Sequence, residues 1–106
     1  MSPPDVASGT LDVTVEVRGE DPVRTVADAA SSEQWVYFNS VDAEVEVVDV
    51  QNHGDSLVLV LRGPGSLESE GEATFNGQRL VIGQWVEIRG SYFAQGTVMD
   101  IEPAAL

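Results

Sequence analysis

Two aspartates that interrupt apolar runs are the first residues of this sequence whose type and spacing could do chemistry. Asp49 lies in Val-Val-Asp-Val at 47–50, and Asp100 lies in Val-Met-Asp-Ile at 98–101. If the fold brought the two carboxylates together, they could bind a cation or share acid–base work. A carboxylate beside a bulge or a turn usually faces solvent instead, and the sequence favours this second interpretation for both residues.

A second group of carboxylates, Glu68, Glu70 and Glu72, alternates with serine and glycine. In an extended chain these three side chains would lie on one face and could form a weak site for Ca²⁺ or Mg²⁺. No glycine-punctuated Asp-x-Asp-x-Asp-Gly loop accompanies them, so a solvated acidic face is the favoured interpretation. We therefore predict no metal and no cofactor, with the two aspartates and these three glutamates as the weak metal candidates.

The residue types that most enzymes need are sparse or badly placed. His53, the one histidine, sits in the turn-like segment Asn-His-Gly-Asp and is expected to be exposed. No serine lies in a Gly-x-Ser-x-Gly elbow, and there is no cysteine. The segment Gly63-Pro64-Gly65 precedes acidic residues that would repel a phosphate. We predict that the chain has no catalytic residues and is not an enzyme.

Aromatic residues supply the candidates for contact with a partner. Trp35 and Trp85 hold matching places in two similar segments, and we expect them to be core anchors, with ligand stacking or a partner contact as alternatives. Tyr92 and Phe93 stand between glycines, where an exposed apolar contact is favoured. We name these last two residues as the candidate partner contacts.

The charge balance restricts the environment and the partners. Eighteen Asp and Glu stand against five Arg and no Lys, which gives a net charge of −13. Such a chain repels itself in dilute salt, whereas molar salt shortens the Debye length to about 3 Å and removes most of the repulsion. The balance predicts a protein from a salt-loving archaeon, with an ordinary acidic domain as the alternative. Binding to nucleic acid is disfavoured because no basic stripe exists to neutralise phosphates.

The apolar pattern predicts a mainly β chain with one short helix. Residues 11–18 alternate strictly, and Val47-Val48 breaks the alternation of residues 43–50 as a β-bulge would. Asp21-Pro22 begins a helix that ends at Ala30, with an apolar stripe of Val23, Val26, Ala27 and Ala30. The other predicted strands are 34–39, 57–61 (covered on both faces), 73–75 and 79–82 (a hairpin around Asn76-Gly77), 84–89 and 97–101, with a flexible loop at 62–71.

Several segments recur in the same order. Val15-Glu16-Val17-Arg18-Gly19 matches residues 59–63, Trp35-Val36 matches Trp85-Val86, and residues 47–50 match residues 98–101. Residues 1–9 read as a disordered lead-in, and 10–103 read as a single domain of two pseudo-repeats, about 10–51 and 56–103. We predict a duplicated small β-barrel or sandwich of about eight strands, in which the two copies exchange strands.

The last strands carry a glycine pattern that can be compared with known families. It reads Gly83-x-x-Val86-Glu87-Ile88-x-Gly90, then Phe93, then Gly96-x-Val98-x-Asp100-Ile101. This pattern resembles the end of an uncharacterised family of archaea and cyanobacteria, the domain of unknown function numbered 4330. The resemblance extends loosely over most of the chain. It implies a membrane-spanning helix ahead of this domain, which these residues do not contain, and it carries over no catalytic residue.

We therefore expect a non-enzymatic, extracytoplasmic interaction or assembly module of a halophilic archaeal protein. The resemblance implies attachment to the cell membrane through a tether outside this sequence, and the partner would be another protein or a second copy of the chain. The alternative is a β-domain that binds a small ligand or a cation through Tyr92 and Phe93 or through the acidic segment 68–72. A ligand-binding domain should stay monomeric and gain stability from its ligand.

Overall fold

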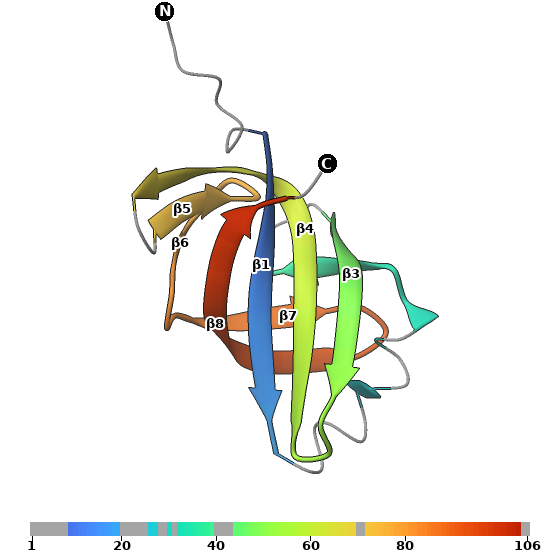
Figure 1. The fold of residues 1–106 in the computed structure, drawn as a ribbon. Helices are drawn as coiled ribbons and strands as arrows, with labels where there is room; N and C mark the ends of the chain where they lie inside the picture. Colours follow the sequence, from blue (N-terminus) through green and yellow to red (C-terminus); the bar gives the residue numbers. More distant parts are fainter. Residues whose placement is uncertain are drawn as a thin grey trace, which may run out of the picture.

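The computed structural model describes residues 9–19, 26–27, 30, 32–39, 44–69 and 72–104. Nearly all of them belong to one antiparallel sheet of eight strands (Figure 1). The mainly β fold predicted from the sequence is confirmed, with the expected number of strands. The strands are β1 (Gly9–Arg18), β2 (Trp35–Phe38), β3 (Glu44–Asn52), β4 (Ser56–Ser69), β5 (Glu72–Phe75), β6 (Gln78–Val81), β7 (Trp85–Arg89) and β8 (Phe93–Pro103).

Six of the strands close into a ring. The sheet runs β1-β8-β7-β2-β3-β4-β5-β6, and β4 also pairs with β1, so that β1, β8, β7, β2, β3 and β4 form a barrel. In Figure 1, β1, β4 and β3 lie side by side at the front, and β7 crosses behind them. The hairpin of β5 and β6 extends from the end of β4 that lies beyond β3. Closure leaves most strands without a free edge.

The barrel interior is filled by alternate residues of its strands. Leu11, Val13, Val15 and Val17 of β1 are fully or almost fully buried, and the residues between them face outward. The rings of Phe38 and Phe75 meet edge to face with their centroids 5.3 Å apart, which joins the hairpin to the barrel core. The alternation seen in residues 11–18 therefore predicts β1 correctly.

Strand β4 differs from its prediction in two ways. Within residues 57–61 only the three leucines are fully buried, while Val58 and Val60 are partly exposed, so the expected cover on both faces is wrong. The expected loop at 62–71 is also wrong over 62–69, because β4 continues to Ser69. Residues 62–65 of this segment pair with β1, and residues 65–69 pair with β5, so neighbouring strands override its turn-like composition.

The predicted turn and the predicted bulge are both present. Asn76 and Gly77 have φ angles of 53° and 83°, as a type I′ turn requires at its two central residues. In the pairing of β3 with β4, Val47 faces Leu61 and Asp49 faces Val60, which leaves Val48 as the extra residue of a bulge. The last strand begins earlier than expected, at Phe93.

The predicted helix is described only in part. Val26, Ala27, Ala30 and Ser32 are helical, and Ser32 lies two residues beyond the expected helix end at Ala30. The stripe residues Val26, Ala27 and Ala30 are buried in the core, as their spacing predicts. The expected helix start, with Val23, and the predicted lead-in at 1–8 lie outside the described residues.

The pairing pattern of the ring has a two-fold correspondence. The ring order is unchanged when β1 is exchanged with β4, β2 with β7, and β3 with β8. The registers follow the same exchange: the pair Trp35–Glu46 corresponds to Trp85–Thr97, and Val15–Val98 corresponds to Leu61–Val47. This register equates Val15 with Leu61, whereas the sequence match equates it with Leu59. The duplication of the sequence stays a prediction.

Candidate functional site

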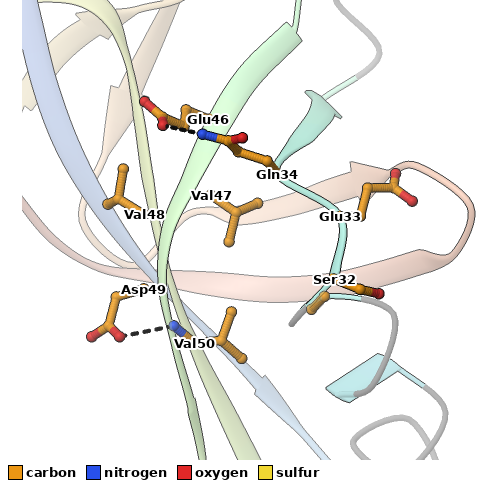
Figure 2. A pocket seen from close by; sticks show the side chains of 9 residues that line it. Ser32, Glu33, Gln34, Glu46, Val47, Val48, Asp49 and Val50 are labelled. Carbon is orange, nitrogen blue, oxygen red and sulfur yellow. Dashed lines mark hydrogen bonds between the residues drawn. The ribbon is translucent and has the colours of Figure 1, made fainter.

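An open hollow of about 650 Å³ lies between the end of the helix and the bulge of β3 (Figure 2). Gln34 donates to Glu46 across 2.7 Å, and the two oxygens of Asp49 accept from the backbone N–H of Val50 and from Gln51. Figure 2 shows Glu33 and Asp49 on opposite sides of the hollow. The carboxylates of Glu33, Glu46 and Asp49 each already accept a hydrogen bond from the protein, and they do not point toward one another. This hollow therefore offers no cation site.

The two aspartates singled out by the sequence do not form a paired site. Asp49 faces Val60, Val60 faces Thr14, and Thr14 faces Asp100, so three strand spacings separate the carboxylates, roughly 14 Å. Both are exposed beside equivalent bulges. Within the described part of the chain, no three His, Asp or Glu residues are placed to hold a metal ion.

The two described glutamates of the acidic segment lie on neighbouring strands and already have protein donors. Glu68 accepts hydrogen bonds from Ser66 and Thr74, both at 3.2 Å, while Glu72 on β5 pairs with Arg79 and accepts from Ser69. The bond from Arg79, followed by the one from Ser69, lowers the pKa of the Glu72 carboxyl. Glu70 lies outside the described residues. Glu68 and Glu72 lie on neighbouring strands and line one small hollow with Thr74 and Arg79, so they share a face across the β4–β5 pair rather than along one extended strand.

Most of the other carboxylates that the structure describes lie on the outer surface of β3, β1 and β8, on either side of β4. One row across these strands is Glu46, Arg62, Asp12 and Glu102. Arg62 bonds both oxygens of Asp12, at 2.8 and 3.0 Å, which raises the pKa of its guanidinium. This row thus contains three carboxylates and one arginine, which is bonded to Asp12. We call this surface, which also carries Glu16, Asp49 and Asp100, the acidic face.

The outer surface of β2, β7 and the start of β8 is aromatic instead. Trp35 and Trp85 are 49% and 60% exposed, so their prediction as core anchors is wrong. The alternation of residue types along β7 indicates this exposure. Trp85 points to the same side of the strand as the charged Glu87 and Arg89, while Val86 and Ile88 point inward. Tyr37 and Phe93 are also exposed. We call the surface formed by Trp35, Tyr37, Arg89 and Phe93 the aromatic face.

Arg89 occupies the middle of the aromatic face. In the sheet register it lies between Tyr37 of β2 and Phe93 of β8, and its guanidinium carbon is 6.0 Å from the centre of the Tyr37 ring. Of the four arginines that the structure describes, Arg18, Arg62 and Arg79 are each paired with a carboxylate, and Arg89 is not. In a chain of net charge −13, this unpaired cation distinguishes the face.

Tyr92 departs from its prediction, whereas Phe93 agrees with it. Phe93 is 54% exposed, but the side chain of Tyr92 is only 8% exposed and belongs to the core. The turn before it is fixed by Glu33, whose two oxygens accept the Ser91 N–H at 2.9 and 3.1 Å. The Glu33 carboxylate occupies the space beside Gly90 that a β-carbon would need. Tyr92 is therefore part of the core next to the aromatic face, and its ring is not exposed for contact with a partner.

Among the residues that the structure describes, the buried Tyr92 hydroxyl has no hydrogen-bond partner. Burial, and to a lesser degree the charge of Glu33, raise the pKa of Tyr92 to about 12. An unsatisfied buried hydroxyl costs about 1–3 kcal/mol, so we expect Tyr92→Phe to raise the free energy of unfolding by about 1 kcal/mol. Urea unfolding near pH 7 measures this change. Tyr37→Phe removes an exposed hydroxyl and should leave stability within about 0.5 kcal/mol of the parent.

The same residue predicts how stability changes at alkaline pH. The ordinary pKa of tyrosine is about 10, so the unfolded chain loses this proton before the folded chain does. Stability should therefore fall between about pH 10 and about pH 12, by up to about 1.4 kcal/mol per pH unit, and Tyr92→Phe should remove this part of the slope. An unchanged slope, or a destabilised Tyr92→Phe variant, would contradict the orphaned hydroxyl.

The remaining candidates are plainly placed. His53 is exposed in its turn, where its backbone N–H donates to the Ser56 carbonyl at 2.9 Å.

None of the helical residues that the structure describes belongs to a helix long and apolar enough to cross a membrane. The fold and the site define a small, mainly β barrel with an acidic face and an aromatic face. No family model, no curated protein and no solved structure matches this chain.

Proposed function

We propose that this chain is a non-enzymatic interaction module that docks a protein partner through its aromatic face. The observation that supports this proposal is the exposure of three aromatic side chains around one unpaired arginine. Trp, Tyr and Arg are the residue types that most often dominate the energy of protein interfaces. The described carboxylates near the hollow of Figure 2 are held by the protein's own donors, which favours binding over catalysis.

The proposed setting follows from the charge and from the family resemblance of the sequence. A net charge of −13 suits a salt-rich medium, in which repulsion between two acidic surfaces is screened. The resemblance to the uncharacterised archaeal family suggests a domain held on the extracytoplasmic side of the membrane by a helix outside these residues. In this setting the module would assemble proteins at the membrane of a halophilic archaeon.

Site-specific photo-crosslinking tests whether the aromatic face is occupied by a protein. A photoreactive phenylalanine analogue replaces Phe93 in the chain expressed in a halophilic archaeon, and a second version carries it at Gln51 on the acidic side of β3. We expect protein adducts at position 93 in at least tenfold excess over position 51. Equal yields, or none at position 93, would contradict the proposal and favour the small-ligand alternative.

A further inference from the structure

Three features of the structure invite a further inference. The hollow beside the β3 bulge supports no inference, because its carboxylates are already hydrogen-bonded within the protein. The exposed apolar residues Ile82, Trp85 and Met99 support none either, because nothing in the structure shows what covers them. The aromatic face differs, since its charges and rings are arranged in a defined row. We infer that the aromatic face binds a second copy of this chain across a two-fold axis that runs along β2. This inference rests on the proposed function.

The row that carries the inference crosses three strands. Tyr37 of β2 pairs with Glu44 of β3 on one side and with Arg89 of β7 on the other. All three side chains are exposed and share the outward parity of their strands. A carboxylate, an aromatic ring and a guanidinium thus stand in line, one strand spacing apart, roughly 4.8 Å.

Such a row is complementary to itself. In an isologous contact, residue i touches residue j of the partner, and j touches i. With the axis along β2, Tyr37 meets Tyr37 of the partner subunit, and Arg89 meets Glu44 of the partner subunit on both sides. Trp35, which follows Tyr37 on the same face of β2, then meets its own copy. Each pairing is between an aromatic and an aromatic, or between opposite charges.

The overall distribution of charge favours this face over the others. The acidic face is centred on β1 and β4, which lie opposite β2 and β7 in the ring, so stacking on β2 and β7 turns the centre of this face in each copy away from the other copy. Arg89 also gains a carboxylate partner, which it lacks among the described residues of its own chain. The contact spans only about four strands, and stable interfaces need roughly 1,000 Å² in total, so we expect a weak dimer that depends on concentration and on salt.

Sedimentation equilibrium of the purified chain in about 2 M KCl tests the inference. We expect the average mass to rise from that of one chain toward that of two as the concentration increases. Arg89→Glu and Glu44→Arg each place like charges opposite each other and should weaken dimerisation at least tenfold. The double variant Arg89→Glu/Glu44→Arg restores opposite charges and should recover the dimer to within threefold. Arg18→Glu makes the same charge change at the far end of β1 and should leave the dimer unchanged.

The outcomes separate this inference from the proposed function. A wild-type chain that stays monomeric up to about 1 mM, or a double variant that fails to recover, would overturn the homodimer. If position 93 still forms adducts with another protein in cells, the interaction module survives with a different partner. If position 93 forms no adducts while the purified chain dimerises through Arg89 and Glu44, the dimer stands and docking in the cell does not.

Discussion

Replacing Gly96 with alanine is expected to lower the melting temperature by about 15 °C, because the barrel has no room for a β-carbon at this position. A β-carbon on Gly96 would lie 2.6 Å from the carbonyl oxygen of Glu16 and 2.7 Å from a methyl group of Val15. Glu16 is fixed on both sides, since it pairs with Val58 of β4 and with Thr97 of β8. Relief of the clash must therefore separate β8 from β1.

The position of Gly96 explains why β8 comes so close to β1 there. Residues 93–97 of β8 pair with β7, and residues 97–103 pair with β1, so Gly96 lies where the strand passes from one partner to the other. Glycine commonly occupies such bends in barrels. Overpacking lowers the free energy of unfolding by about 1–3 kcal/mol where side chains can adjust. Because the contact here is with the backbone, we expect a loss of about 3 kcal/mol, which lowers the melting temperature by roughly 15 °C in a domain of this size.

Gly63→Ala is the matched control for Gly96→Ala. The three atoms nearest to its β-carbon would all be side-chain atoms, a methyl carbon of Val45 at 3.0 Å and two ring carbons of Phe75 at 3.2 and 3.3 Å. These groups can move, so we expect a loss of about 1 kcal/mol. Thermal unfolding followed by circular dichroism compares the two variants. A Gly96→Ala protein that melts within 3 °C of the parent would show that β8 and β1 are not held as closely as the barrel requires.

The period of the apolar residues explains which parts of the fold could be predicted. Where burial alternates, as in β1 and β7, the residue types alternate with it, and the strands follow from the sequence. Asn76-Gly77 and the phase slip at Val48 have local causes, so they too could be predicted. The segment Gly63-Pro64-Gly65 looks like a loop by itself. It becomes part of β4 because β1 lies beside it, and a single sequence does not show that neighbour.

The site was harder to predict because it depends on which strands become neighbours. Their matching places in two similar segments favour Trp35 and Trp85 as core anchors, whereas Glu87 and Arg89 mark the side of β7 that carries Trp85 as outward. Tyr92 and Phe93 are adjacent and similar in type, yet strand alternation sends one inward and the other outward. The row of Glu44, Tyr37 and Arg89 joins three strands, and β7 is distant from the other two in sequence, so no local sequence pattern predicts the row.

The wild-type chain is expected to melt at least 15 °C lower in 10 mM KCl than in 2 M KCl. At 10 mM the Debye length is about 30 Å, so every carboxylate of this small barrel repels the others, whereas molar salt shortens that distance to about 3 Å. The ion pairs of Arg18, Arg62 and Arg79 act in the opposite direction, since salt weakens them. Surface pairs contribute at most about 1 kcal/mol each, and eighteen acidic residues outnumber five arginines, so repulsion dominates.

Salt also strengthens apolar burial, and a variant with fewer charges separates this effect from screening. Five exposed carboxylates are replaced by their amides, which removes five negative charges from the net −13: Asp49, Asp55, Glu68, Asp100 and Glu102. If repulsion sets the salt dependence, this variant should gain at least 5 °C in 10 mM KCl and change little in 2 M KCl. A salt dependence that is identical in the two proteins would assign the effect to apolar burial. It would also remove the physical reason for placing this barrel in a salt-rich medium, because the excess of carboxylates would then carry no cost that salt relieves.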